Sequence, residues 1–127
     1  MSECKGGCLC GKIQYVIEGT PDPAMQFTCH CRDCQQVTGA GHARSMGVPE
    51  HMVKWSGQPK VYNIQHEAST VATAFCEACG SPIYKATTNL PGAIFFHVGS
   101  LDPTSSQVWS SKQTAFPESR PAWDVLD

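Results

Sequence analysis

The chain has 127 residues, a mass of 13.7 kDa and a formal net charge of −2, which together fit one domain. With nine Lys and Arg residues and a pI near 6.2, it lacks the basic surface of a nucleic-acid-binding protein, and no apolar stretch is long enough to cross a bilayer. Residues 1–7 contain no apolar signal segment, so we expect a cytoplasmic location. Val, Ile, Leu and Phe make up only 23 of the 127 residues, so cysteine chemistry is expected to supplement a thin apolar core.

Short β-strands dominate the secondary structure that the sequence predicts. In residues 11–19, Ile13, Tyr15 and Ile17 alternate with mainly polar residues, which is the pattern of a half-buried strand. A short helical turn is predicted over 33–38, ended by the glycines at 39 and 41. The other predicted strands cover residues 26–28, 42–48, 52–55, 61–65, 70–75, 82–86 and 93–98. Strands at spacings of about ten residues indicate an all-β domain.

The last part of the chain differs in composition. Residues 104–127 contain few apolar side chains and two Ser-Ser pairs, so we predict an irregular tail, anchored by Trp109 and Trp123.

Eight cysteines are the distinctive feature of the sequence. Seven of them fall in C-x-C or C-x-x-C clusters, namely Cys8, Cys10, Cys29, Cys31, Cys34, Cys76 and Cys79. Tetrahedral zinc needs thiolates about 3.8 Å apart, since Zn–S bonds measure about 2.3 Å, and clusters of this kind supply them. The clustering and the lack of an export signal favour zinc over four disulfides, and a C-x-x-C redox pair is a third interpretation. Cys4 is most simply a free thiol.

Two of the clusters predict a closed zinc site. Cys76 and Cys79 are followed by Gly80, as in a zinc knuckle, where a tight turn aims backbone N–H groups at sulfur. Cys8 and Cys10 would face the same way on an extended segment. Each pair supplies two ligands, so we expect all four thiolates to bind one structural zinc ion.

The remaining cluster contains three thiolates, Cys29, Cys31 and Cys34. Three protein ligands and one open position are typical of a catalytic zinc, where water or substrate completes the shell. A fourth protein ligand is the alternative, supplied by Cys4, His30, Asp33 or another histidine. Two zinc ions are therefore expected per chain, the second held less firmly than the first.

Four segments together resemble the glutathione-dependent formaldehyde-activating family, whose domain is shared with centromere protein V. These segments are Gly7–Gly11, Cys29–Cys34 followed by Thr38-Gly39, Phe75–Pro82, and Gly99-Ser100-Leu101-Asp102. The resemblance covers residues 4–103, and residues 104–127 are then the tail of a single GFA-like domain spanning 1–127. The sequence departs from the family pattern at residues 108–116, in a region where members often carry His-Ile-Tyr/Phe and then Ala-Pro-Trp.

The resemblance implies a fold, a metal assignment and a reaction. The fold is an all-β, zinc-clamped β-tent of short antiparallel strands. Cys8, Cys10, Cys76 and Cys79 correspond to the structural zinc, and Cys29, Cys31 and Cys34 to a second zinc where a glutathione-type thiol binds. The implied reaction forms or breaks a carbon–sulfur bond, as between glutathione and formaldehyde.

We therefore expect a zinc-dependent carbon–sulfur lyase or glutathione-adduct-forming enzyme that acts on a small electrophile such as an aldehyde. The expected partner is a small-molecule thiol, with neither nucleic acid nor membrane involved. Arg32 and Arg44 are candidates to hold the carboxylates of glutathione through paired hydrogen bonds, and His30 is a candidate proton carrier. The alternative is a non-catalytic, zinc-stabilised binding module on the same fold.

Overall fold

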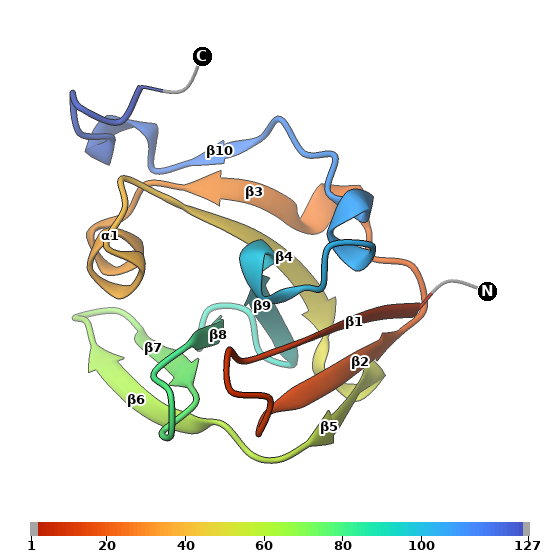
Figure 1. Ribbon diagram of the computed structural model, residues 1–127. Coiled ribbons are helices and arrows are strands. Elements are labelled where there is room, and N and C mark those ends of the chain that lie inside the picture. Colours follow the sequence, from red (N-terminus) through yellow and green to blue (C-terminus); the bar gives the residue numbers. More distant parts are fainter. Residues whose placement is uncertain (1–2, 126–127) are drawn as a thin grey trace.

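The computed structural model describes residues 3–125, and within them the chain is mostly β with one short α-helix (Figure 1). The smaller sheet has the order β1 (Glu3–Gly7), β2 (Gln14–Glu18), β5 (Val53–Ser56). The larger sheet has the order β10 (Thr114–Ala115), β3 (Gln26–Cys29), β4 (Ala43–Pro49), β9 (Ala93–His97), β8 (Pro82–Thr87), β7 (Thr70–Phe75), β6 (Lys60–Gln65). The helix α1 is Arg32–Thr38, and 3-10 turns cover Pro23–Met25, Glu50–Met52, Val98–Ser100, Ser105–Val108 and Pro117–Ser119. All strand pairs are antiparallel except β10 with β3.

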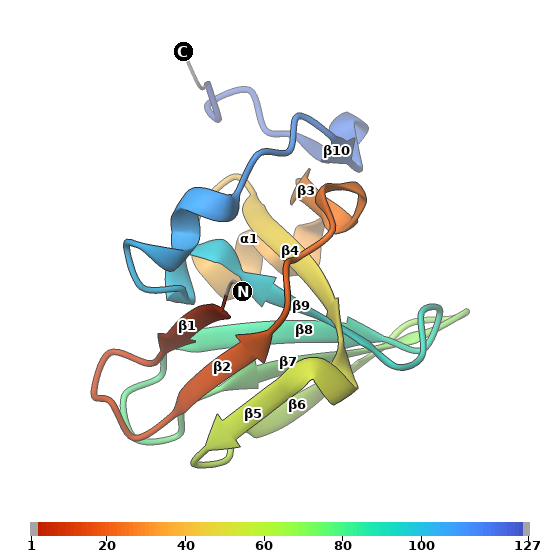
Figure 2. The same ribbon diagram turned by 90° about the vertical axis from the view of Figure 1, so that its right-hand side faces the viewer.

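The core lies between the two sheets. Figure 2 shows β1, β2 and β5 in front of the strands of the larger sheet. Tyr15 of β2 stacks on Phe96 of β9 with ring centroids 4.2 Å apart, and both side chains are buried. Ile17, Met46 and Ile83 complete this contact. The alternating apolar residues of β2 therefore point into the core, as the sequence predicts.

The opposite face of the larger sheet carries the second cysteine group. Residues directly opposite each other in paired strands share a face, and successive residues alternate. Cys29 pairs with Ala43, and Ser45 pairs with His97, so Arg44 points to the other side. This face, called the thiol face below, contains Phe27, Cys29, Lys85, Phe95 and His97. It is also the face to which α1 brings Cys34.

The all-β prediction is confirmed, and every strand expected from alternation is present with ends shifted by a few residues. Two strands were missed. β1 contains two glycines and no apolar alternation, and it forms because it pairs with β2 along its whole length. Cys4 in this strand is fully buried in the core. β10 has two residues and exists only because it adds to the edge of β3.

Residues 104–125 contain 3-10 turns and β10. Trp109 packs against the core, whereas the side chain of Trp123 is 68% exposed. Among the described residues, no helix has the length and apolar character that a membrane span requires.

Candidate metal and thiol site

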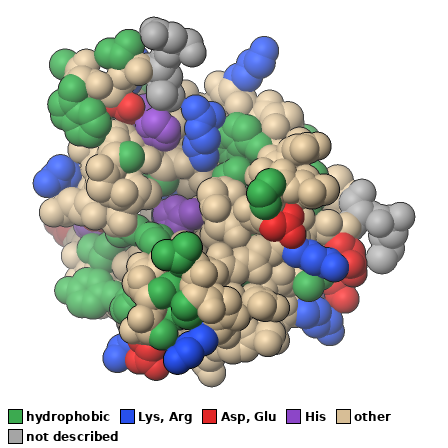
Figure 3. Space-filling view, viewed as in Figure 1, with side chains coloured by type: hydrophobic (Ala, Val, Ile, Leu, Met, Phe, Trp, Pro, Cys, Tyr) green, Lys and Arg blue, Asp and Glu red, His purple; other side chains and the backbone are tan. Residues whose placement is uncertain are grey.

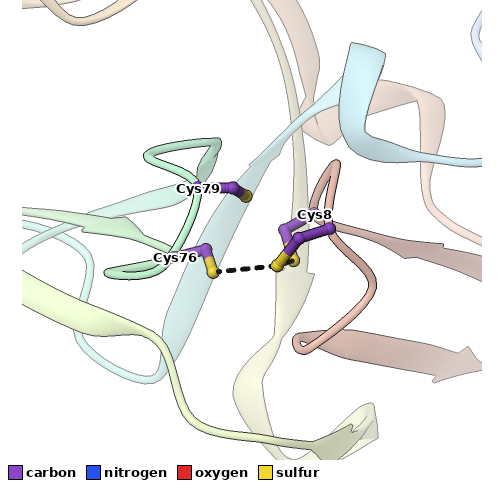
Figure 4. A group of neighbouring side chains, drawn as sticks. Cys8, Cys76 and Cys79 are labelled. Atoms are coloured by element: carbon purple, nitrogen blue, oxygen red, sulfur yellow. Dashed lines mark hydrogen bonds between the residues drawn. The ribbon is translucent and has the colours of Figure 1, made fainter.

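Two turns from distant parts of the sequence bring four cysteines together. Cys8 and Cys10 lie in the β1–β2 turn, and Cys76 and Cys79 lie in the β7–β8 turn, with their sulfur atoms within 4.8 Å of one another. Figure 4 shows the side chains of Cys8, Cys76 and Cys79 converging from the two turns. The Sγ atoms of Cys8 and Cys10 are 3.6 Å apart, and those of Cys10 and Cys76 are 3.8 Å apart. These are the separations of thiolates around a tetrahedral zinc ion.

Backbone geometry explains why these turns form. Gly80 has a φ of +78°, and its N–H donates to the Cys76 carbonyl, which closes the knuckle. The Ile13 N–H donates to Cys8 Sγ at 3.2 Å, so a backbone dipole supports the thiolate. The Leu9 N–H donates to Ser81 Oγ at 3.0 Å and links the two turns directly.

Cys79 and Cys10 differ in acidity, which bears on what this donor set can hold. Hydrogen bonding by Ser81 lowers the pKa of Cys79 to about 5. For Cys10, the Lys12 N–H favours the thiolate, but desolvation and the sulfur atoms of Cys8 and Cys79 raise its pKa to about 11. The protein alone therefore does not favour four adjacent thiolates, and a divalent cation is what such a donor set fits.

The second group combines a strand end with the first turn of a helix. Cys29 ends β3, Cys31 is the N-cap of α1, and Cys34 lies in its first turn. Their three sulfur atoms lie within 4.8 Å of one another. Cys29 and Cys34 are buried, and Cys31 is half-buried. The donor set suits zinc with three protein ligands.

No further His, Cys, Asp or Glu atom in residues 3–125 belongs to this three-sulfur group. The candidates for a fourth ligand lie elsewhere. Cys4 is in the core between the sheets. Asp33 pairs with His66 at 2.7 Å. The His30 ring faces the Gly41 carbonyl, 3.1 Å from its Nδ1.

Lys85 is the site residue that the sequence analysis missed. Its Nζ lies 2.8 Å from Cys34 Sγ and donates a hydrogen bond to it. Burial opposes the charge of Lys85, but electrostatic attraction to the sulfur atoms of Cys34 and Cys29 outweighs this and raises its pKa. The only signal in the sequence is a lysine inside an otherwise apolar strand, beside Ile83, Tyr84 and Ala86.

Acidity within the second group is also divided. Hydrogen bonds from Cys31 and Cys34, with a contribution from Lys85, lower the pKa of Cys29. The contact with Cys29, above all, raises the pKa of Cys31 and of Cys34. The group therefore holds one thiolate readily, and a bound cation would be needed to stabilise all three.

A neutral histidine lies on the thiol face, the face of the larger sheet that carries Cys29. His97 is buried, and burial together with the charge of Lys85 lowers its pKa to about 4. Neither ring nitrogen of His97 nor Ser45 Oγ, directly opposite it, has a hydrogen-bond partner among the described residues.

A cavity of about 490 Å³ opens beside the three cysteines. Its charged or sulfur-bearing lining includes Cys29, Cys31, Arg32 and Lys85. Its apolar lining includes Phe27, Val71, Leu90, Phe95 and Phe116. A second, wider cavity of about 1000 Å³ lies elsewhere and is lined by Arg44, whose guanidinium is 5.8 Å from the centre of the Trp109 ring. The structure thus places Arg32 beside the thiols and Arg44 on the other face of the sheet.

A third polar cluster joins the segment that carries the second cysteine group to the C-terminal segment. His42 Nδ1 lies 3.0 Å from Asp124 Oδ2, and His30 Nδ1 lies 3.3 Å from the same oxygen. Gly41 allows this approach, since a Cβ there would overlap the Asp124 side chain. In Figure 3, a histidine lies beside an acidic side chain at the upper left, where Figure 1 places the C-terminal segment. These donors could hold a metal, yet both histidines already have acceptors. We call this cluster the latch, because it ties the residues on either side of α1 to the C-terminal segment.

The fold and these two cysteine groups define an all-β protein with a four-thiolate and a three-thiolate site, each able to hold a metal ion. The chain belongs to the family of the glutathione-dependent formaldehyde-activating enzyme, whose family model matches residues 3–119. This match extends past residue 103 into the tail, further than the sequence motifs reach.

Comparison with solved structures supports the fold. A Rhodobacter sphaeroides protein of known crystal structure superposes with a TM-score of 0.62 at 19% sequence identity, over 78% of this chain and 88% of that one. At this identity the likeness concerns the fold alone. No curated protein matches the sequence.

Proposed function

We propose that the protein is a zinc-dependent carbon–sulfur lyase, or adduct-forming enzyme, that joins a glutathione-type thiol to a small electrophile such as an aldehyde. The observation that carries the proposal is a group of three cysteines, without a fourth protein ligand among the described residues; two of the three, Cys29 and Cys31, line a cavity of about 490 Å³. A zinc ion held by Cys29, Cys31 and Cys34 would leave one position for a substrate thiol and would favour its thiolate form. Family membership supports a glutathione-related role.

Lys85 prepares this site for an anionic ligand. Three thiolates and a divalent cation together carry one negative charge, which would repel an incoming thiolate. The ammonium of Lys85, 2.8 Å from Cys34 Sγ, offsets that charge. The substrate thiolate therefore enters a site that is close to neutral.

Arg32 and Lys85 would also orient the substrates. Glutathione has two carboxylates, and Arg32 lines the cavity where a carboxylate can pair with its guanidinium. In the forward direction the thiolate attacks the electrophilic carbon, a carbon–sulfur bond forms, and the carbonyl electron pair moves to oxygen. Lys85 Nζ, which lines the same cavity, can donate a hydrogen bond to that oxygen, and water supplies its proton. Carbon–sulfur cleavage is the reverse of these steps.

Calorimetry on the zinc-loaded protein tests the proposal. Glutathione should bind, and S-methylglutathione should bind much more weakly because it offers no thiolate. Binding should weaken as the pH falls, since protons compete for thiolate, and as salt rises. Equal binding of both compounds, or no binding at millimolar concentration, would favour the non-catalytic binding module instead.

A further inference from the structure

We propose that the electrophile handled at this site carries an apolar group, aromatic or branched aliphatic, which packs against Phe116 and Leu90 beside the thiolates. The inference rests on the proposed thiol chemistry and specifies its substrate class. It requires a substrate larger than formaldehyde on the carbon side of the carbon–sulfur bond.

The lining of the cavity is divided by character. Its cationic groups, Arg32 and Lys85, suit the carboxylates and the oxygen of the reacting pair, while the one carboxylate in the lining, Asp33, is paired with His66. Much of the remaining wall consists of aromatic and aliphatic side chains of β3, β7, β9, the β8–β9 turn and the tail, namely Phe27, Val71, Leu90, Phe95 and Phe116, with the polar residues Ser69, Thr87 and Asn89 at other points of the lining. Neither glutathione, which is a polar peptide, nor a one-carbon electrophile matches this apolar wall.

Two of these apolar side chains are only partly covered by the protein itself. Leu90 is 48% exposed and Phe116 is 55% exposed, although both line the cavity. Large apolar side chains left open around a cavity that also holds a reactive group are the contacts that a ligand would cover. They come from segments far apart in the sequence, so the fold assembles this wall.

The backbone conformation of Phe116 is unusual for a residue with a side chain. Phe116 has a φ of +54°, and no other non-glycine residue among 3–125 has a positive φ. A phenylalanine in this conformation immediately before a proline is strained, and glycine would adopt it freely. The conformation is fixed from both sides, because the His30 N–H donates to the Ala115 carbonyl at 3.0 Å and the Ser119 N–H donates to the Phe116 carbonyl at 3.0 Å. The chain thus keeps an aromatic ring at a position where the backbone favours glycine.

Phe116 also lies close to the thiols. Ala115 pairs with Cys29 across the parallel β10–β3 contact, so the residue after it lies next to the reactive group. Lys85 Nζ lies 5.7 Å from the centre of the Phe27 ring, which places the charged and apolar parts of the cavity beside each other. A substrate with an apolar group attached to its electrophilic carbon would contact both parts.

The test compares two thiols as probes on the zinc-loaded protein by calorimetry. Benzyl mercaptan carries an aromatic group one carbon from sulfur, and 2-mercaptoethanol is small and polar. We expect benzyl mercaptan to bind at least about tenfold more tightly, from burial of its ring. Phe116→Ala and Leu90→Ala should each reduce that preference about threefold or more, and should leave 2-mercaptoethanol within about twofold of wild type.

Two further variants separate substrate contact from structure. Tyr62→Ala removes an exposed aromatic ring of β6 that does not line the cavity, and it should change neither affinity. Phe116→Gly should lose the preference for benzyl mercaptan while its melting temperature stays at or above that of wild type, because glycine relieves the backbone strain.

The outcomes are distinct. Equal affinity of wild type for the two thiols overturns the inference and leaves the proposed function standing. If Phe116→Ala weakens the binding of both thiols equally, the ring has only a structural role, and this result also overturns the inference. Binding of neither thiol at millimolar concentration removes the proposed function itself.

Discussion

Lys85 Nζ on strand β8 donates a hydrogen bond to Cys34 Sγ on helix α1, across a distance of 2.8 Å. The contact joins the larger sheet to the helix that carries Cys34. It also places a buried positive charge where the three cysteines concentrate negative charge. The second site is therefore the product of two distant segments, although its three cysteines are neighbours in sequence.

Replacing Lys85 should loosen the second metal ion. Lys85→Met removes the hydrogen bond and the compensating charge, and such outer contacts are commonly worth about 10- to 100-fold in metal affinity. The rate of zinc transfer to a coloured chelator measures this, and one of the two zinc ions should be lost faster. Lys60→Met is the matched control, since Lys60 pairs with Glu77 on the surface. Identical release from the two variants would contradict the assignment.

The two cysteine groups should support the fold unequally. Cys76→Ser removes one thiol of the four-cysteine site, where a structural zinc ion would contribute about 10 kcal/mol or more to folding, comparable to the stability of a whole domain. This variant should be largely unfolded by circular dichroism. Cys31→Ser should remain folded and retain one zinc ion per chain. Equal melting temperatures for the two variants would show that the sites are not divided in this way.

The two arginines should differ in their effect on glutathione binding. Arg32→Ala should weaken it about two- to fivefold, the usual size for a solvent-accessible ion pair. Arg44→Ala should have no effect, because Arg44 points to the opposite face of the sheet and lines the other cavity. Calorimetry at low and high salt checks both, and the Arg32 effect should shrink as salt rises. A loss of affinity in Arg44→Ala alone would reverse this assignment.

The latch at the C-terminal segment should show a defined pH dependence. The hydrogen bond from His42, above all, holds the pKa of the Asp124 carboxyl below its usual range. Its contribution to stability is therefore present at neutral pH and is lost only as the pH falls below about 4. In urea unfolding, Asp124→Asn should be less stable than wild type, and the gap should not shrink between pH 7 and pH 5. A gap that closes within that range would mean that the pKa of the Asp124 carboxyl is raised and not lowered.

Local pattern and long-range pairing explain which features the sequence could predict. Alternation predicts strands such as Gln14–Glu18, and cysteine spacing predicts both thiolate groups, because each depends on residues close in sequence. Lys85 and the Asp124 latch depend on strand register and on the path of the tail, which no local pattern records. For the same reason the sequence could not show that Arg32 and Arg44 line different cavities. Arg44 alternates with Ala43, and only the register with Cys29 shows which of the two faces the thiols.

The parallel pairing of β10 with β3 has a consequence for the order of assembly. Ala115 completes the edge beside Cys29, yet it follows Cys29 by most of the length of the chain. During synthesis, all ligands of the four-cysteine site have emerged once Cys79 has, whereas the edge of β3 stays open until the tail follows. The two sheets can therefore form before β10 does, and the edge of the larger sheet beside Cys29 is completed last.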